Sequence, residues 1–452
     1  MGNAAIKRTL LAQCLLIAFS STSLHIHAEE KKEENARKSI EVIVVTGEKT
    51  ERSVKDTASS VSVINQALLD SGQLVSMSDA LTDVSNVVVL TGAVPDIRGV
   101  SGNGSATGFN SFTGGARARV STLVDGVTQP FVADLTGDTG LWDIEQVEVF
   151  RGPQSTSNGR NSIGGAVYVN TKDPTMDWEG AVRLGYRNQE NFFDSAAVMT
   201  GPVIDDELAF RIASQWIDGE TYSNPKSYST NPTQKSYDTL DTSNTRAKLL
   251  WTPKQLTDFK ALFSYQHYQE EGNAGRLYFN AKDPEAHEPL FQRYLTTESD
   301  TSSLKLDYKL SELFSLQTLV AFMDYQWGAE GYEATQAAES DVLMDQTELT
   351  FDTKLDYGSA SSQYSGFFGV AYFKREQDFK SVGATNYFGD DESNSKAAYG
   401  EATVRLNDVW SLISGVRVER EQQQRDFSLL MRGAWVNAVL DQSKTFTLPK
   451  LV

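Results

Sequence analysis

Beyond Pro174 the chain repeatedly alternates apolar residues with charged or small ones, the period-two pattern of strands with one apolar and one polar face. The clearest apolar sets are Val182, Leu184 and Tyr186; Leu208, Phe210, Ile212 and Trp216; Ala247, Leu249 and Trp251; Leu304, Leu306, Tyr308 and Leu310; Leu349, Phe351 and Leu355; and Trp410, Leu412, Val416 and Val418. At roughly ten residues or more they exceed most soluble-sandwich strands, and Trp or Tyr near their ends suits a membrane interface. The pattern therefore favours antiparallel transmembrane strands over a soluble β-sandwich.

The connections between these segments differ in length. Short turns are expected at Pro202–Asp206, Pro253–Asp258, Ser311–Leu313 and Asn407–Val409. Long connections are expected at Gly219–Asp241, Glu271–Thr296, Gly328–Asp341 and Ser381–Ser393. Short turns on one side and long loops on the other are typical of outer-membrane barrels, which have short periplasmic turns.

The part before Pro174 has a different character. Ile144, Val147 and Val149 alternate with polar residues until Arg151-Gly152-Pro153 ends the strand. A second strand, Ile163–Val169, contains Gly164-Gly165, and glycines inside a strand indicate that another backbone passes close by. Further elements are a strand leading into a helix over Ser59–Leu69, a strand over Val87–Leu90, and a strand over Leu123–Val127 with a turn at Asp125-Gly126. These elements predict a small α+β domain.

The N-terminus has the layout of a secretory signal peptide. Lys7 and Arg8 precede a short apolar core, Leu10–Phe19, and a cleavage site is expected after Ala28. The core is about half the ~20 residues that a membrane-spanning helix needs. The only cysteine, Cys14, lies in this leader; lipid attachment there is the less favoured alternative. The mature chain would then have no thiol chemistry.

Four motifs in order resemble the plug domain of TonB-dependent outer-membrane receptors of the ferric-siderophore type. They are EVIVVTG (Glu41–Gly47), DIRG (Asp96–Gly99), LVDGV (Leu123–Val127) and EVFRGPQST followed by GRNSIGGAVYVNTKDP (Glu148–Pro174). The resemblance implies an α+β plug domain followed by an antiparallel transmembrane β-barrel, which in this family closes with about 22 strands. About 12 strands are expected here, so we interpret the chain as a C-terminally truncated receptor with a partial barrel. A small complete barrel is the alternative, but its bore would not easily hold the plug.

The domain organisation predicted in this way has four parts. Residues 1–28 are the signal peptide, 29–52 the spacer and TonB box, 53–174 the plug domain, and 175–452 the partial transmembrane β-barrel. The spacer is charged and has almost no apolar residues, which predicts a flexible tether.

The resemblance assigns TonB binding to Glu41, Val42, Ile43, Val44, Val45, Thr46 and Gly47. Four β-branched residues behind a flexible tether also suit addition as a strand to a partner's sheet edge. An ordinary first strand of the plug is the alternative.

The resemblance also implies ligand-binding residues and a lock between plug and barrel. Phe109, Phe112 and Arg117 lie in one glycine-rich loop and Phe131 in a second, and both loops resemble plug apices that contact ligand. An unstructured loop is the alternative; the glycine spacing does not match a dinucleotide site. Arg98 and Arg151 are expected to pair with barrel glutamates, with solvated turn arginines as the alternative.

Charge and histidine content narrow the function classes. The formal net charge of −19 argues against nucleic-acid binding. Outside the leader the histidines are His267 and His287, whose spacing predicts neither a metal site nor a catalytic triad. We expect no enzyme activity, because the transport that the resemblance implies breaks no bond in the substrate. Aromatic, acidic outer loops, including Tyr387 and Phe388, favour a neutral or cationic chelate as ligand.

The expected function is TonB-dependent active transport across the bacterial outer membrane, with a ferric siderophore as the implied ligand. The implied partners are TonB with its inner-membrane energising complex and outer-membrane lipid; iron enters only as a chelate, and no cofactor is expected. Uptake of cobalamin, haem or an oligosaccharide, an outer-membrane enzyme, and a truncated fragment that does not transport remain alternatives.

Overall fold

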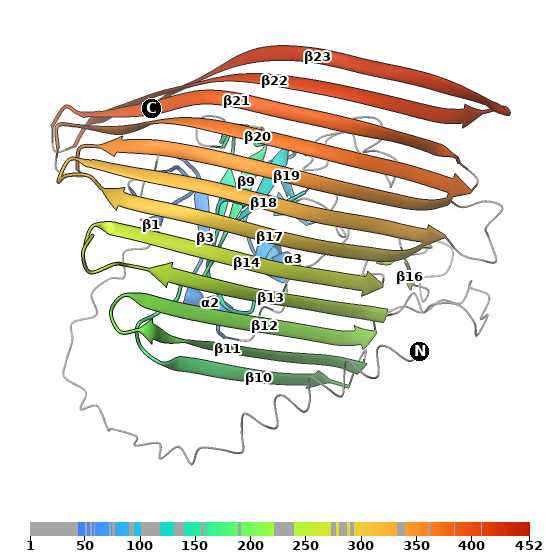
Figure 1. Ribbon diagram of the computed structural model, residues 1–452, viewed down its shortest axis with the longest axis horizontal. Helices are drawn as coiled ribbons and strands as arrows, with labels where there is room; N and C mark the ends of the chain where they lie inside the picture. Colours follow the sequence, from blue (N-terminus) through green and yellow to red (C-terminus); the bar gives the residue numbers. More distant parts are fainter. Residues whose placement is uncertain are drawn as a thin grey trace. The chain divides into compact units, whose positions relative to one another are not determined.

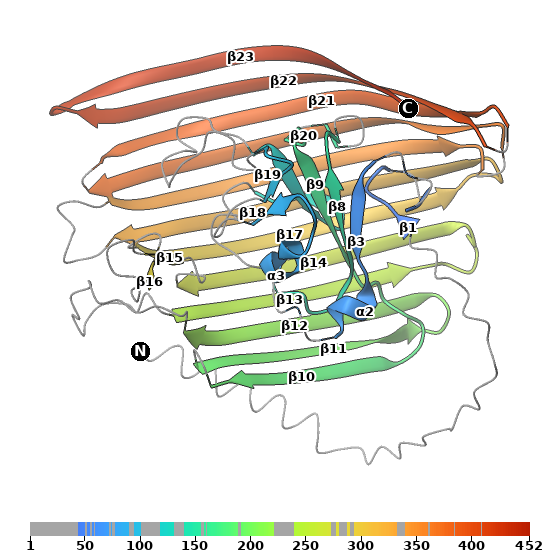
Figure 2. The ribbon, with the colours of Figure 1, turned by 180° about the vertical axis from the view of Figure 1, so that it is seen from behind.

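The computed structural model describes residues 44–49, 52–54, 57, 59–71, 74, 77–89, 95–100, 118–130, 140–154, 158–159, 161–188, 191–220, 239–272, 277–279, 287–289, 293–331, 340–359, 362–383, 385–407 and 409–452. These residues fall in one compact unit. They form a small mixed domain and a large antiparallel sheet (Figures 1 and 2).

The small domain is built around a five-stranded sheet in the order β3-β8-β9-β6-β7. Its strands are β3 (Val61–Ile64), β6 (Val120–Val124), β7 (Val127–Thr128), β8 (Ile144–Arg151) and β9 (Gly165–Thr171). Only β6 and β9 pair in parallel. Two short helices, α2 (Gln66–Leu69) and α3 (Met77–Thr82), and two small two-stranded sheets, β1 (Val44–Val45) with β2 (Arg52–Ser53) and β4 (Val87–Val88) with β5 (Asp96–Ile97), complete it.

Two local predictions in this domain are confirmed. Asp125 and Gly126 both have positive φ and join β6 to β7, the geometry of the tight hairpin turn that Asp-Gly favours. A Cβ at Gly165 would clash with the carbonyl oxygen of Phe150 on β8, so the close backbone approach expected of the paired glycines is real. The core of the domain is apolar and comprises, among others, Ile64, Leu81, Ile97, Val120, Val147, Val149 and Val167.

The large sheet contains twelve strands joined as a meander. They are β10 (Glu179–Arg187), β11 (Phe192–Ile204), β12 (Leu208–Glu220), β13 (Thr239–Trp251), β14 (Phe259–Gly272), β17 (Arg293–Lys309), β18 (Phe314–Gly331), β19 (Ser340–Tyr357), β20 (Tyr364–Gly383), β21 (Tyr387–Arg405), β22 (Ser411–Met431) and β23 (Ala434–Leu451). A short hairpin of β15 (Leu277–Phe279) and β16 (His287–Pro289) lies between β14 and β17. Among the described residues, β10 and β23 each pair with one neighbour, which agrees with a partial barrel of about twelve strands.

The two faces of this sheet differ as the alternation predicts. One face, here called outward, exposes the apolar sets: Ile212 is 48% and Val416 47% exposed. The other, inward face buries polar side chains, so that Arg211 and Arg417 are 6% and 4% exposed. The small domain lies against the inward face (Figure 2). None of the described helices is long and apolar enough to cross a membrane.

One predicted connection is wrong. Ser381–Ser393 is not a long loop, because β20 continues to Gly383 and β21 begins at Tyr387. Tyr387 and Phe388 are thus strand residues, the first buried on the inward face and the second exposed on the outward face. The polar stretch after them pairs regularly with β20, since cross-strand hydrogen bonding does not require apolar side chains. The other three long connections and the four short turns fall where they were expected, but the flanking strands extend further than predicted; β11, for example, continues to Ile204, inside the turn predicted at Pro202–Asp206.

Candidate functional site

The first described residues, Val44–Lys49, are folded back onto the small domain. Val44 and Val45 pair with β2 at two positions only, and Val45 is completely buried. A tight turn follows, in which the Lys49 N–H donates to the Thr46 carbonyl at 3.0 Å and Lys49 adopts a left-handed conformation (φ 64°). We call residues 44–49 the N-terminal segment.

The N-terminal segment is held by a carboxylate of β8. The Thr46 N–H lies 3.0 Å from Oε1 and 3.1 Å from Oε2 of Glu148, the Thr46 hydroxyl donates to Oε1 at 2.8 Å, and the Gly47 N–H donates to Oε2 at 3.0 Å. Glu148 is completely buried. A Cβ at Gly47 would clash with the rings of Phe150 and Tyr168, so the backbone lies flat on the sheet.

The end of the segment reaches the large sheet. Lys49 Nζ pairs with Asp352 Oδ2 of β19 at 2.7 Å and lies 4.8 Å from the ring centroid of Tyr399 on β21. Burial lowers the pKa of Lys49, and the attraction of Asp352 offsets only part of that effect. Lys354 donates to the Lys49 carbonyl, and Lys450 of β23 lies 3.7 Å from Glu48.

A second contact between the small domain and the sheet is a buried ion pair. Asp143, just before β8, accepts from Arg211 of β12 through two guanidinium nitrogens, with Nε at 2.9 Å from Oδ2. Asp143 adopts a left-handed conformation (φ 61°), which Asp tolerates better than most residues. Arg246 of β13 donates to the neighbouring Trp142 carbonyl.

A third contact centres on Lys248 of β13. Its Nζ lies 3.2 Å from Asp125 Oδ2 and 2.9 Å from Asp173 Oδ1, and it donates to the Thr171 carbonyl at 3.2 Å. Asp125 also accepts from the N–H and hydroxyl of Thr171 at 2.8 and 2.7 Å. Burial acts to raise the pKa of Asp125, but Lys248 and these hydrogen bonds outweigh it and hold the pKa below its usual range.

Comparisons with known proteins show what this arrangement is similar to. The family model described as TonB-dependent Receptor Plug Domain matches residues 53–166. The chain is 28% identical over 198 residues to the iron-regulated outer membrane virulence protein of Vibrio cholerae. This alignment covers 40% of the present chain and 28% of the Vibrio protein. It is 32% identical over 166 residues to the catecholate siderophore receptor Fiu of Escherichia coli, with coverages of 36% and 20%.

The whole fold also has solved counterparts. The ferric yersiniabactin uptake receptor FyuA of Yersinia pestis aligns with a TM-score of 0.74 at 18% identity, over 87% of this chain and 61% of that one. The open form of Fiu aligns with a TM-score of 0.67 at 14% identity, over 88% and 67%. Residues 53–166 therefore match a TonB-dependent receptor plug domain, and the fold as a whole is that of the solved receptors. Outer-membrane localisation and the plug-and-barrel fold follow, although the chain spans less than a third of the curated relatives described above.

Because the plug model matches residues 53–166, the small domain is called the plug below, and the predicted sites can be located in the structure. Val44–Gly47 of the predicted TonB box lie in the N-terminal segment, whereas Glu41, Val42 and Ile43 lie outside the described residues. The predicted ligand contacts Phe109, Phe112, Arg117 and Phe131 also lie outside them. These assignments stay predictions.

The predicted lock residues Arg98 and Arg151 lie inside the plug. Arg151 Nη1 donates to the Ser85 carbonyl at 3.0 Å, and the Arg98 N–H donates to the neighbouring Asn86 carbonyl at 2.9 Å. Their pairing with barrel glutamates stays a prediction.

The sequence did not predict the contacts that join the plug to the sheet. In most of them an acidic side chain of the plug pairs with a basic side chain of the sheet. Arg211 and Lys248 occupy polar positions of alternating strands, and this position alone indicates that they lie on the inward face. Nothing in the sequence identifies Asp143 and Asp125 as their partners.

The sheet also carries an inward aromatic surface, consisting of Tyr325, Trp327, Phe379, Tyr387 and Phe427 on β18 and β20–β22. Ring centroids of Phe379, Tyr387 and Phe427 lie 5.9–6.2 Å apart, and Arg425 lies over Phe379 at 5.9 Å. Met323, Met344 and plug residue Val127 pack with it.

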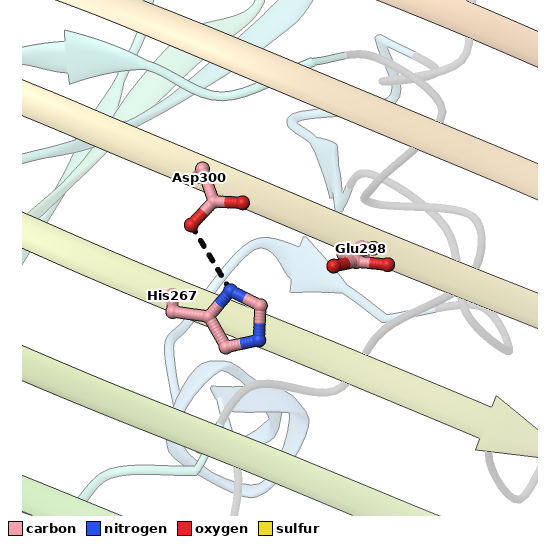
Figure 3. Close-up of side chains that lie close together, drawn as sticks. All are labelled: His267, Glu298 and Asp300. Carbon is pink, nitrogen blue, oxygen red and sulfur yellow. Dashed lines mark hydrogen bonds and ion pairs between the residues drawn. The ribbon is translucent and has the colours of Figure 1, made fainter.

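Strand pairing brings His267 of β14 beside Asp300 and Glu298 of β17 (Figure 3). Their donor atoms lie within 4.8 Å of one another, and His267 Nδ1 lies 3.0 Å from Asp300 Oδ1. Imidazole and carboxylates could bind a divalent cation. However, these three residues have the same strand parity as the exposed Phe263 of β14 and Leu304 of β17, so they lie on the outward face. They therefore take no part in the contacts between plug and sheet.

Proposed function

We propose that this chain takes part in TonB-dependent uptake of a ferric siderophore across the outer membrane. The observation that carries the proposal is the placement of the N-terminal segment: an extended strand with two backbone pairings is held on a plug that is itself bound to the inward face of the sheet. The relatives named as iron-regulated and siderophore receptors support iron as the cargo.

In the proposed cycle, ligand binds on the side of the long connections and shifts the plug towards states in which the N-terminal segment is free. TonB then pairs with the freed strand and exerts force on the plug. No bond of the ligand is broken, and iron passes as a chelate. Known members of this family are transporters rather than enzymes, which fits this role.

The inward aromatic surface supports a ligand with aromatic groups. Tyr325, Trp327, Phe379 and Tyr387 are at most 3% exposed and pack with Val127 of the plug, so a ligand would reach them only after the plug has moved. The uncovered rings would then provide edge and face contacts to a catecholate, the ligand class named for Fiu. A Trp327→Ala variant should then weaken binding of a ferric tris-catecholate more than binding of a ferric hydroxamate.

The test of uptake uses a bacterial strain without its own catecholate receptors. Cells that express the chain should accumulate radioactive iron from a ferric tris-catecholate only when TonB is present. Val44→Pro should reduce the uptake rate at least about ten-fold, because proline removes a backbone donor and blocks strand pairing. Val44→Ala is the matched control and should retain most of the rate.

Equal accumulation with and without TonB would overturn the proposal. So would uptake of haem or cobalamin, but not of any ferric siderophore, by the same cells.

A further inference from the structure

Glu148 has an unusual environment for a buried carboxylate. Its hydrogen-bond donors are all uncharged: the N–H and hydroxyl of Thr46, the N–H of Gly47, and the side-chain amides of Gln146 (2.6 Å) and Asn170 (3.2 Å). The side chain is 0% exposed. A buried carboxylate depends on such donors, because burial without them is costly.

Three of these five donors belong to the N-terminal segment. If the segment left, Glu148 would keep only the two amides. Hydrogen bonds to charged groups are stronger than those between neutral groups, so release of Val44–Gly47 is opposed mainly at this side chain. Glu48 and Lys49 are held separately, by Lys450 and Asp352.

The two amides also hold the segment directly. Gln146 donates to the Val44 carbonyl at 3.1 Å, and Asn170 lies 3.3 Å from the Thr46 hydroxyl. The other contacts of Val44–Gly47 are two paired positions with β2 and the buried side chain of Val45, and none of these involves a charged group.

We propose that Glu148 is a latch: it positions Val44–Gly47 in the docked state and occupies the Thr46 and Gly47 N–H groups that a pairing strand of TonB would use. Glu148 is a positioning residue, and the cluster of Glu148, Gln146 and Asn170 sets how rarely the segment is free. The latch rests on the proposed function for the identity of the partner, but the docking itself does not.

The experiment uses outer membranes containing the full chain with Val45→Cys as the probe. Val45 is 0% exposed, and the only natural cysteine lies in the leader, so a maleimide reports exposure of the segment. Glu148→Gln keeps the volume of the side chain, but it replaces one accepting oxygen with an NH₂ group that cannot accept a hydrogen bond from the backbone N–H of Thr46 or Gly47. It should raise the labelling rate on the order of ten- to a hundred-fold, the ratio expected for lost charged hydrogen bonds.

Glu145→Gln is the matched control, because it removes one charge from the same strand at an exposed position; its labelling rate should equal that of the parent. Binding of a purified TonB periplasmic domain, without any siderophore, should strengthen for Glu148→Gln and not for Glu145→Gln. Heat-modifiable migration checks that each barrel is folded.

If Glu148→Gln does not fold, Thr46→Val replaces it: loss of the hydroxyl donor should raise labelling several-fold. Unchanged labelling in the folded variant would overturn the latch. Faster labelling without any TonB binding would leave the latch standing and overturn the proposed function instead.

Discussion

The plug and the strand sheet place their apolar residues in opposite ways. In the plug, Val147, Val149 and Val167 are 0% exposed and form a core. In the sheet, Leu184 and Phe322 are 72% and 51% exposed, while Arg211 and Glu419 are buried. Exposed apolar side chains in such numbers would be a liability in water, but they are the normal outer surface of a barrel in lipid. The inward face thus provides buried charges, and the plug satisfies several of them.

The largest effect is expected from breaking the buried pair of Asp143 and Arg211. Asp143→Asn leaves the guanidinium without its carboxylate and should destabilise the docked plug by about 3–5 kcal/mol. Hydrogen exchange of the β8 and β9 amides in membrane-embedded protein measures this change.

The double variant Asp143→Leu with Arg211→Met is the control, since no unpaired charge remains. It should recover much of the lost protection. A double variant as unstable as the single one would show that the pair itself, rather than the orphaned charge, stabilises the plug.

An intermediate effect is expected on the outward face. Val320 lies between Phe314 and Phe322 on β18, and Val320→Arg should cost about 2–4 kcal/mol, as a cation does near the bilayer centre. Stability of the chain folded into lipid vesicles is the measurement.

Gln326→Arg, on the same face of β18 but beyond Asp324, is the matched control and should cost about 0–1 kcal/mol. Equal losses at the two positions would contradict a lipid-facing band on this strand.

The smallest effect is expected at the plug surface. Lys172 Nζ lies 3.3 Å from Asp70, whose side chain is 54% exposed. Asp70→Asn should change the free energy of unfolding by only about 0–1 kcal/mol, and added salt should reduce the difference further. If Asp70→Asn lost as much stability as Asp143→Asn, exposed and buried ion pairs would contribute equally to this protein, contrary to expectation.

The main elements of the fold could be predicted from the sequence because each rests on local periodicity. The sets around Ile212, Leu249 and Val416 are apolar at every second position, and this alone assigns strand and face. The sequence predicts a loop at Tyr387, because the polar residues after it show no apolar repeat; in the structure β20 supplies their backbone partners. The ligand contacts expected at Phe109, Phe112, Arg117 and Phe131 stay predictions.

The sequence by itself determined which face of each strand is apolar and which family the motifs resemble. Only the tertiary structure decided that Asp143 meets Arg211, that Asp125 meets Lys248, and that Glu148 holds Thr46 and Gly47. Alternation is a property of neighbouring residues, whereas these partners lie about 70 to 120 positions apart. Their choice depends on how two independently patterned surfaces dock, and a pattern of period two contains no information about that.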